Sequence, residues 1–281
     1  MELVPQDGTR FILPLKKYLH MNRIHQLFQQ KQAEILSVYF TAGFPRLNDT
    51  REILRQLQAH NVNMVEIGIP FSDPMADGVV IQQSSHVSLQ QGMTLRKLFD
   101  QLSDVRSEIT MPLIMMGYLN PIMQFGFESF CQKCQETGID GIIIPDLPFS
   151  EYLSDYKPIA DKYNLSVIML ITPQTSEERI RLIDQHTNSF IYMVSSAATT
   201  GAQSSFDEGK QTYFRRIKAM HLQNPQLIGF GISNADTLQA AFVNAQGAIV
   251  GSQFIKELKQ SPDNIGNAVV ELLRRLNSKT E

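Results

Sequence analysis

The sequence lacks tryptophan, has only two cysteines in 281 residues, and carries almost balanced charge, with a formal net charge of −3. The missing tryptophan decides nothing by itself. A near-neutral chain lacks the basic surplus with which proteins hold nucleic acid or an anionic membrane surface. No run of about eighteen apolar residues occurs, so a membrane-spanning helix is not expected. A hydrophobic content of 43% and a charged content of 19% are typical of a globular protein.

The two cysteines, Cys131 and Cys134, have the CxxC spacing of a redox pair. They lie in FESFCQKCQETG, a stretch with a helical pattern, and no second pair or nearby histidine completes a zinc set. We therefore expect two thiols in the middle of a helix, no metal, and a cytoplasmic location, where thiols stay reduced.

The first twenty residues, MELVPQDGTRFILPLKKYLH, differ from the rest in pattern. Their apolar stretch is too short for a signal peptide, and no small-residue cleavage site follows it. From Met21 the sequence reads as an amphipathic helix, with Ile24, Leu27 and Phe28 at helical spacing. We expect residues 1–20 to be an extension from an upstream start, poorly ordered at its beginning, and residues 21–281 to form one domain.

Short apolar runs alternate with stretches of helical periodicity along this domain. Near-continuous apolar runs are typical of parallel strands that are buried on both faces. Eight alternations favour an α/β fold, a (β/α)₈ TIM barrel with an extra N-terminal helix, over an open doubly wound sheet. No GxGxxG follows the first run, which disfavours dinucleotide binding. The runs are Leu36–Thr41, Met64–Gly68, Leu113–Tyr118, Gly141–Pro145, Ser166–Ile171, Phe190–Ser195, Leu227–Gly231 and Ala248–Ser252.

Residues that are common at the N-cap position of helices occur at the start of several helical stretches. We expect Thr94, Ser150, Thr175 and Asn234 to cap helices, because their side chains can accept from backbone N–H groups in the first turn. The periodic stretches are Asn48–His60, Thr175–His186, Ser205–His221, Asn234–Ala245 and Asp263–Leu276.

A carboxylate interrupts the second apolar run, in MVEIGIPFSDPMADG. Glu66 lies inside the predicted strand, where a charge is unfavourable unless it is paired or used. We expect it to face the barrel mouth, where burial raises a carboxyl pKa and suits the group to proton transfer. A structural pairing with a basic residue is the alternative, but the predicted strand ends hold no lysine or arginine. Asp77, in the following loop, either reaches the same cavity or makes a turn or helix cap. Asp73 is more typical of a turn or an interface.

Glycines occur at the ends of the sixth, seventh and eighth predicted strands: Gly201 in the loop after the sixth, Gly229 and Gly231 in the stretch Gly229–Ser233, and Gly251. Glycine lets backbone N–H groups approach an anion, and barrels often bind phosphate in these loops. The alternative is that each glycine only makes a tight turn. Three such positions together favour a phosphate site.

No lysine or histidine lies at a predicted strand end, which disfavours a Schiff-base aldolase and a metal-dependent aldolase. What remains is carboxylate acid/base chemistry on a phosphorylated substrate. Apolar side chains near the mouth either wrap a flat aromatic substrate or simply fill the barrel. These are Tyr39, Ile81, Met116, Tyr192 and Phe230.

The stretch VEIGIPFSDPMADG closely resembles the signature of tryptophan synthase alpha subunits. The resemblance runs from Met21 nearly to the C-terminus and includes YFTAGFP, GYLNP, IIIPDLP, GFGIS and AIVGS, in order and at fitting distances. It implies a (β/α)₈ barrel that cleaves indole-3-glycerol phosphate to indole and glyceraldehyde 3-phosphate, a carbon–carbon lyase reaction of tryptophan biosynthesis.

The resemblance also implies roles for individual residues. Glu66 would shuttle protons between indole C3 and the glycerol hydroxyl. Asp77 would hold the indole N–H, and Thr200, another substrate-binding residue, would contact Asp77 when the loops close. The phosphate would be held by Gly201, Phe230, Gly231, Gly251 and Ser252. The indole would be held by Tyr39, Ile81, Met116, Tyr192 and Phe230.

The resemblance further implies a partner, a beta subunit that carries pyridoxal phosphate, in an alpha2beta2 heterotetramer. No cofactor is expected in this chain. Pro70, Asp73, Asn120 and Pro148 match positions that face the partner. One departure occurs in the loop after the sixth strand, Ser195–Gly201, where an arginine and a glycine of many members are replaced. Because loss of the arginine removes a possible anchoring salt bridge, loop closure and signalling to the partner are in question.

Two other functions stay open. A different phosphate-binding barrel, such as a sugar-phosphate isomerase or a stand-alone indole-releasing lyase, would share the glycines. A catalytically silent barrel that activates a beta subunit would share the partner residues, although intact Glu66 and Asp77 argue against it.

Overall fold

The computed structural model describes residues 22–195 and 208–278. The predicted extension, residues 1–20, and the predicted site residues Thr200 and Gly201 lie outside the described residues. Within the described ranges, no helix has the length and apolar character needed to cross a membrane.

Each predicted apolar run contains a strand, and every pairing between the strands is parallel. The predicted runs extend one or two residues too far at several carboxyl ends, because apolar residues such as Tyr118 and Pro145 continue the pattern after the ladder has stopped. The strands are β1 (Ile35–Thr41), β2 (Met64–Gly68), β3 (Leu113–Met116), β4 (Gly141–Ile143), β5 (Ser166–Ile168), β6 (Leu170–Ile171), β7 (Ile191–Val194), β8 (Gln226–Gly229) and β9 (Gly247–Val250).

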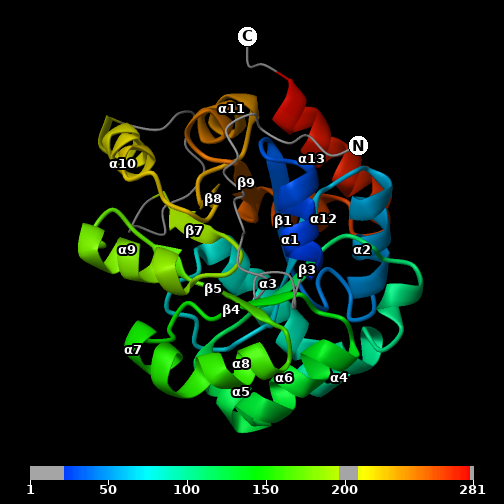
Figure 1. Cartoon of the computed structure of the whole chain (residues 1–281). Coiled ribbons are helices and arrows are strands. Elements are labelled where there is room, and N and C mark those ends of the chain that lie inside the picture. The colour runs from blue at the N-terminus through cyan, green and yellow to red at the C-terminus, as the bar shows by residue number, and fades with distance from the viewer. Residues whose placement is uncertain (1–21, 196–207, 279–281) are drawn as a thin grey trace, which may run out of the picture.

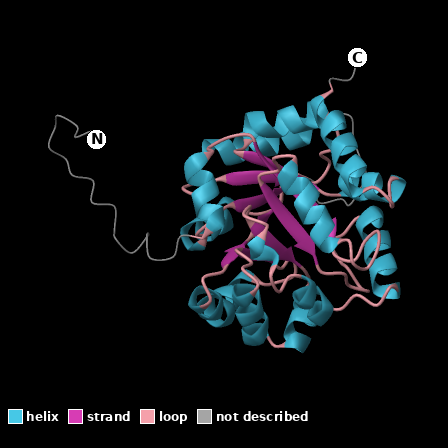
Figure 2. Ribbon diagram, turned by 90° about the vertical axis from the view of Figure 1, so that its right-hand side faces the viewer, coloured by secondary structure: helices cyan, strands magenta, loops and turns pink. Residues whose placement is uncertain are grey.

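The strand order closes the sheet into a barrel. It runs β5-β4-β3-β2-β1-β9-β8-β7-β6, so that β5 and β6 lie at its two ends. Only Met169 separates these two strands in the chain, and its carbonyl accepts a hydrogen bond from the Tyr192 N–H on β7 at 3.0 Å. The two segments are therefore one interrupted fifth strand, and the predicted (β/α)₈ barrel is confirmed. Figure 2 shows the strands at the centre with helices around them.

Helices follow the strands around the barrel (Figure 1). Short 3₁₀ and π-helical turns occur at Val105–Ser107 and Tyr152–Tyr156. The α-helices are α1 (Arg23–Gln30), α2 (Thr50–Ala59), α3 (Val79–Gln90), α4 (Leu95–Gln101), α5 (Leu119–Phe125), α6 (Phe127–Glu136), α7 (Phe149–Glu151), α8 (Lys157–Lys162), α9 (Glu177–His186), α10 (Glu208–Ala219), α11 (Ala235–Asn244), α12 (Ser252–Gln260) and α13 (Ile265–Asn277).

Two of the four predicted caps are confirmed: Thr94 caps α4 and Asn234 caps α11 through side-chain hydrogen bonds. The other two are wrong. Ser150 lies inside α7, after Pro148 at its N-cap position. The Thr175 hydroxyl accepts from the Thr172 N–H at 2.9 Å, and Ser176 caps α9 instead. A local turn thus competes with the cap for the same hydroxyl.

Alternation along the strands sorts the apolar side chains into two clusters. On β1, Ile35 and Tyr39 belong to the cluster inside the barrel, whereas Val38 and Phe40 belong to the cluster between the barrel and its helices. Ile24 of α1 is fully buried in the inner cluster. The predicted N-terminal helix is therefore confirmed, and it plugs one end of the barrel.

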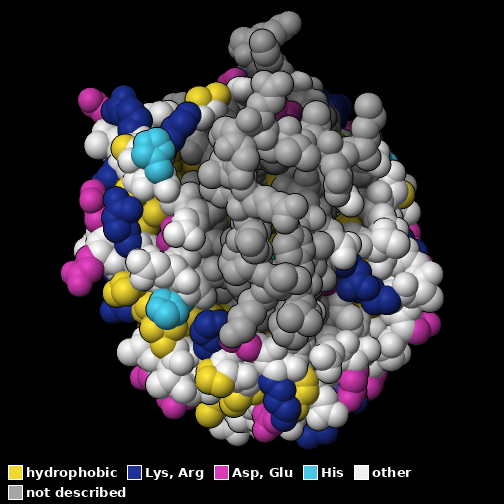
Figure 3. Space-filling model, in the orientation of Figure 1, with side chains coloured by type: hydrophobic (Ala, Val, Ile, Leu, Met, Phe, Trp, Pro, Cys, Tyr) yellow, Lys and Arg dark blue, Asp and Glu magenta, His cyan; other side chains and the backbone are white. Residues whose placement is uncertain are grey.

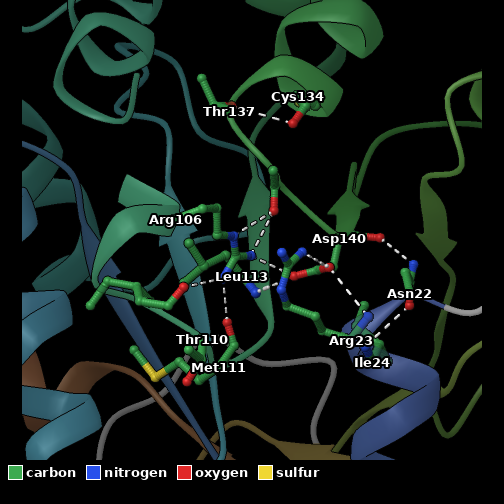
Figure 4. Close-up of polar contacts among 12 residues, drawn as sticks. Asn22, Arg23, Ile24, Arg106, Thr110, Met111, Leu113, Cys134, Thr137 and Asp140 are labelled. Carbon is green, nitrogen blue, oxygen red and sulfur yellow. Dashed lines mark hydrogen bonds and ion pairs between the residues drawn. The ribbon is translucent and has the colours of Figure 1, made fainter. Parts of the chain in front are cut away.

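A polar network around Asp140 holds this plugged end together (Figure 4). Asp140 directly precedes β4, and its carboxylate accepts from the Leu113 N–H at 3.0 Å and from Arg106 Nη2 at 2.6 Å. Arg23 Nη1 on α1 donates to the same carboxylate at 3.1 Å. Asp140 thereby ties α1 to the amino ends of β3 and β4. The opposite end, at the carboxyl ends of the strands, is left for a ligand.

Both cysteines lie in α6, as the sequence pattern predicts, and both are buried. Burial raises the pKa of the Cys131 thiol to about 12 and raises that of Cys134 well above its usual range. Neither thiol forms the reactive thiolate at neutral pH.

The surface carries charges of both signs. On the face turned to the viewer in Figure 3, basic and acidic side chains are interspersed around the rim. This distribution agrees with the near-zero net charge.

Candidate active site

A cavity opens at the carboxyl ends of the strands and brings together most of the predicted site residues. Its walls come from β1, β3, β7, the loop before α3, and the loops that follow β8 and β9. Carboxyl strand ends are where barrel enzymes place their chemistry. The predicted residues that line it are Tyr39, Asp77, Ile81, Met116, Tyr192, Phe230, Gly231, Gly251 and Ser252.

Glu66 is fully buried on β2, inside the barrel and level with Tyr39 on β1. Its Oε1 accepts a hydrogen bond from Ser37 Oγ at 3.0 Å, and its Oε2 has no hydrogen-bond partner among the described residues. Burial raises the pKa of Glu66 to about 8, against a smaller lowering by Ser37. Neither oxygen is hydrogen-bonded to a basic side chain in the described part of the chain, so no ion pair within that part explains this residue.

Two tyrosines connect Glu66 to the cavity. Glu66 does not itself line the cavity, but Tyr39 and Tyr192 do. Burial raises the pKa of both tyrosines most, and the charges of Asp77 and Glu66 raise both values further, with Asp77 the larger for Tyr39 and Glu66 the larger for Tyr192. Each hydroxyl occupies the space beside a glycine: a Cβ at Gly68 would lie 2.1 Å from the Tyr39 hydroxyl, and one at Gly229 would lie 2.2 Å from that of Tyr192. The two glycines thus make room for the rings.

Asp77 lies in the loop between β2 and α3 and is 9% exposed. Burial raises its pKa to about 6, and a hydrogen bond from Tyr118 lowers it in part. The same Tyr118 hydroxyl accepts from the Ala76 N–H at 2.9 Å, which holds the loop against the start of α5. Gly78, not Asp77, occupies the N-cap position of α3. The helix-cap alternative for Asp77 is therefore wrong, and its carboxylate faces the cavity.

The part of the cavity that is lined by the loops after β8 and β9 has the features of an anion site. Phe230 and Gly231, after β8, both have left-handed backbone conformations, with φ values of +67° and +80°. Gly251 occupies the N-cap position of α12 and has no side chain to satisfy the first-turn N–H groups, whereas Asn234 caps α11 with its own side chain. Free N–H groups at a helix N-terminus bind phosphate well.

Lys256 adds a positive charge to this end of the cavity. It lines the cavity and lies one helical turn after Ser252, on the same side of α12. Side chains on a helix lean toward its N-terminus, which directs the ammonium group toward the proposed anion site.

Sequence reasoning did not identify Ser37, Tyr118 or Lys256. Two signals were available: Ser37 is a polar residue at an inward position of the first strand, and Lys256 lies four residues after Ser252. Tyr118 stands in the GYLNP stretch, but nothing in the pattern showed that its hydroxyl would meet Asp77.

The residues predicted to face a partner lie around the same rim. Asp73, Asn120 and Pro148 are exposed, whereas Pro70 is buried. Large apolar side chains are exposed close to Asp73 and Asn120 in the sequence, with Met75 82%, Val79 65% and Met123 49% accessible. Exposed apolar side chains of this size are found at interaction surfaces.

Comparisons with known proteins agree on one family. The family model described as tryptophan synthase alpha chain matches residues 25–280. The tryptophan synthase alpha chain of Parabacteroides distasonis is 62% identical over 256 residues, which cover 91% of this chain and 99% of that protein. Tryptophan synthase subunit alpha from Legionella pneumophila has a similar structure, with a TM-score of 0.79, 31% identity, and coverage of 92% and 99% of the two chains. A chain of the tryptophan synthase complex from Pyrococcus furiosus gives 0.78 and 30%, with coverage of 86% and 96%.

Proposed function

Because the chain belongs to the tryptophan synthase alpha chain family, we propose that Glu66 and Asp77 carry out that family's reaction at the barrel mouth. The reaction is the retro-aldol cleavage of indole-3-glycerol phosphate to indole and glyceraldehyde 3-phosphate, in tryptophan biosynthesis. The observation that carries the assignment of residues is Glu66, a buried carboxyl group with its pKa raised to about 8 behind an apolar cavity.

The raised pKa suits Glu66 to act first as an acid. At neutral pH the carboxyl group is mostly protonated, so it can give its proton to indole C3. The carboxylate that results can then take the proton of the hydroxyl group on the adjacent glycerol carbon. As that proton leaves, the C–C bond breaks, its electron pair returns to the indole ring, and the carbon becomes the aldehyde of glyceraldehyde 3-phosphate. Glu66 ends protonated, as it began.

Asp77 supports this step as an anion. Protonation of C3 leaves positive charge on the indole ring, which is greatest at the ring nitrogen. With a pKa of about 6, Asp77 is mostly ionised at neutral pH and can accept a hydrogen bond from the indole N–H. Tyr118 holds the neighbouring Ala76 N–H and interacts with the Asp77 carboxylate, and the walls formed by Met116, Tyr192 and Phe230 can enclose the flat ring.

The substrate's phosphate group fits the part of the cavity that is lined by the loops after β8 and β9. The first turn of α12 and the loop after β8 offer backbone N–H groups, and Lys256 offers a charge. With the phosphate group at this position, the glycerol chain would lie between the phosphate and Glu66. Gly201 and Thr200 remain proposed contacts, since they lie outside the described residues.

Glycerol 3-phosphate is expected to raise the melting temperature of the protein, because a ligand that binds only the folded state stabilises it. Lys256→Gln should weaken this binding about tenfold, which corresponds to about 1.4 kcal/mol. Lys259→Gln, on the exposed side of the same helix, is the matched control and should bind like the wild type. Thermal melts at increasing ligand concentration measure both variants. Equal binding by all three proteins would remove Lys256 from the phosphate site.

The purified chain is expected to release indole from indole-3-glycerol phosphate, and a beta subunit should increase the rate. Indole is measured by its absorbance or by extraction and colour reaction. If no indole is released either with or without the beta subunit, Glu66 and Asp77 do not carry out this reaction. A catalytically silent barrel that only activates its partner would then be favoured.

We include the beta subunit, with its pyridoxal phosphate, in the proposal. The relative from Pyrococcus furiosus comes from a tryptophan synthase complex, and the rim around Asp73, Asn120 and Pro148 carries exposed apolar side chains. An alpha2beta2 heterotetramer would cover this rim. A cytoplasmic location, in which Cys131 and Cys134 stay reduced, belongs to the same proposal.

A further inference from the structure

Ser37 breaks the apolar pattern inside the barrel. On β1, every second residue faces inward, and the inward residues on either side of Ser37 are Ile35 and Tyr39, both part of the inner apolar cluster. Ser37 is 0% exposed. A buried hydroxyl group is unfavourable unless it finds a hydrogen-bond partner, and alanine or valine would fill this position without that requirement.

The partner of this hydroxyl group is Glu66. Ser37 Oγ donates to Oε1 at 3.0 Å, across the pair of adjacent strands β1 and β2. Oε2 is buried and has no partner among the described residues. The two oxygens of one carboxyl group are therefore different: Oε1 accepts a hydrogen bond from the barrel wall, and Oε2 has no hydrogen-bond donor among residues 22–195 and 208–278.

We propose that Ser37 is a positioning residue for catalysis, which holds Oε1 of Glu66 so that Oε2 is the atom that exchanges the proton with substrate. This inference rests on the proposed role of Glu66. In the protonated carboxyl group, Oε1 accepts from Ser37 and the proton lies on Oε2. After the proton has moved to indole C3, the same hydrogen bond stabilises the carboxylate. Ser37 thus orients both forms of the group without changing its own protonation.

The hydrogen bond also tunes the acidity of Glu66. Burial raises its pKa, and the donation from Ser37 opposes that rise. The titratable groups near Glu66 on the packed elements are Tyr39 on β1 and Tyr192 on β7, and Asp77 acts on the same two rings. On β3, the neighbouring inward residues are Ile114 and Met116, which do not titrate. Loss of the Ser37 hydroxyl should therefore move the Glu66 pKa upward.

Ser37→Ala is expected to lower kcat for indole release about tenfold and to change KM by less than twofold, because the phosphate and indole contacts remain. The falling limb of the rate against pH, which reports loss of the Glu66 proton, should move to higher pH. Ser37→Thr keeps a hydroxyl group and should restore both kcat and the position of the limb. A purely structural serine would give none of these pH effects.

An infrared difference spectrum against Glu66→Gln gives a readout that needs no turnover. The carbonyl band of protonated Glu66 should shift to higher frequency in Ser37→Ala, because the hydrogen bond to Oε1 is lost, and should return in Ser37→Thr. If Ser37→Ala does not fold, Ser37→Cys, which has nearly the same volume and a weaker donor, should show the same changes in smaller size.

The outcomes separate the two levels of inference. If Glu66→Gln is inactive but Ser37→Ala leaves the pH limb, kcat and the infrared band unchanged, the role of Ser37 is wrong and that of Glu66 stands. If Glu66→Gln keeps its activity, the proposed catalytic residue is wrong, and the role of Ser37 fails with it.

Discussion

Replacing Glu66 by glutamine is expected to lower kcat for indole release by about 10³-fold or more, within the range of general acid–base catalysis. The amide has nearly the shape of the carboxyl group and can still accept from Ser37, but it can neither give a proton to indole C3 nor take one from the hydroxyl group. Binding of glycerol 3-phosphate, measured by calorimetry, should stay within twofold of the wild type. Activity above a few per cent of the wild type would remove Glu66 from this role.

Asp184→Asn provides a control for the loss of a buried carboxylate elsewhere. Asp184 lies on α9 and accepts from the N–H groups of Gln223 and Asn224 at 2.8 and 2.9 Å, away from the cavity. This variant should lose stability, because those N–H groups lose a charged acceptor, while its kcat remains that of the wild type. A loss of kcat equal to that of Glu66→Gln would show that the assay reports general damage to the fold.

Glu66→Gln should also change how stability depends on pH. The folded-state pKa of Glu66 is raised from 4.5 to about 8, so the native state binds its proton more tightly than the unfolded chain. Its stabilising contribution is complete below about pH 4.5 and is lost as pH rises through 8, by an amount on the order of a few kcal/mol. Glutamine does not titrate, so the variant does not lose this stability. The melting temperature of the variant minus that of the wild type should therefore increase between pH 5 and pH 9.

Replacing Asp77 by asparagine is expected to lower kcat about a hundredfold, a smaller effect than that of Glu66→Gln, since one charge-assisted hydrogen bond is lost rather than the proton donor itself. Asparagine can still meet the indole N–H but brings no negative charge. The rising limb of the rate against pH, which the wild type should show near pH 6, should disappear because the group that titrates there is gone. A pH series of kcat measures both effects.

Tyr118→Phe is the comparison for Asp77. It keeps the ring but removes the hydroxyl group that donates to Asp77 and accepts from Ala76. We expect a partial loss of activity, with the limb near pH 6 shifted upward rather than abolished. Wild-type activity in Asp77→Asn would return Asp77 to a turn-forming role, whatever Tyr118→Phe does.

The barrel itself could be predicted from the sequence because burial on both faces leaves a strong signal. Parallel strands enclosed by helices must be apolar along their length, and all eight runs showed this. The interruption of the fifth strand at Met169 could not be predicted, since Met169 is as apolar as its neighbours and differs only in its pairing. Caps were predicted less well, because Thr175 and Ser176 are chemically similar and only the local turn selects between them.

Only some residues of the candidate site could be predicted, because only some of them leave a signal in the local sequence. Glu66 stood out because a charge in an apolar strand has a high energetic cost, and the glycines stood out by their place after strands. Ser37 and Tyr118 act through single hydrogen bonds to residues 29 and 41 positions away in the sequence. Such contacts depend on the closed barrel and leave no mark in local periodicity.

The positions of Tyr39 and Tyr192 have a consequence for how this pocket can be redesigned. Gly68 and Gly229 touch no substrate in the proposed reaction, yet any side chain at either position would collide with a tyrosine hydroxyl. A single methyl group at either position would therefore displace a tyrosine ring that lines the cavity, and would change the shape of the pocket without replacing Glu66 or Lys256. The two tyrosine–glycine pairs are therefore positions at which the shape of the pocket can be changed, and variants selected for bulkier or smaller indoles should include them as well as the residues that carry charge.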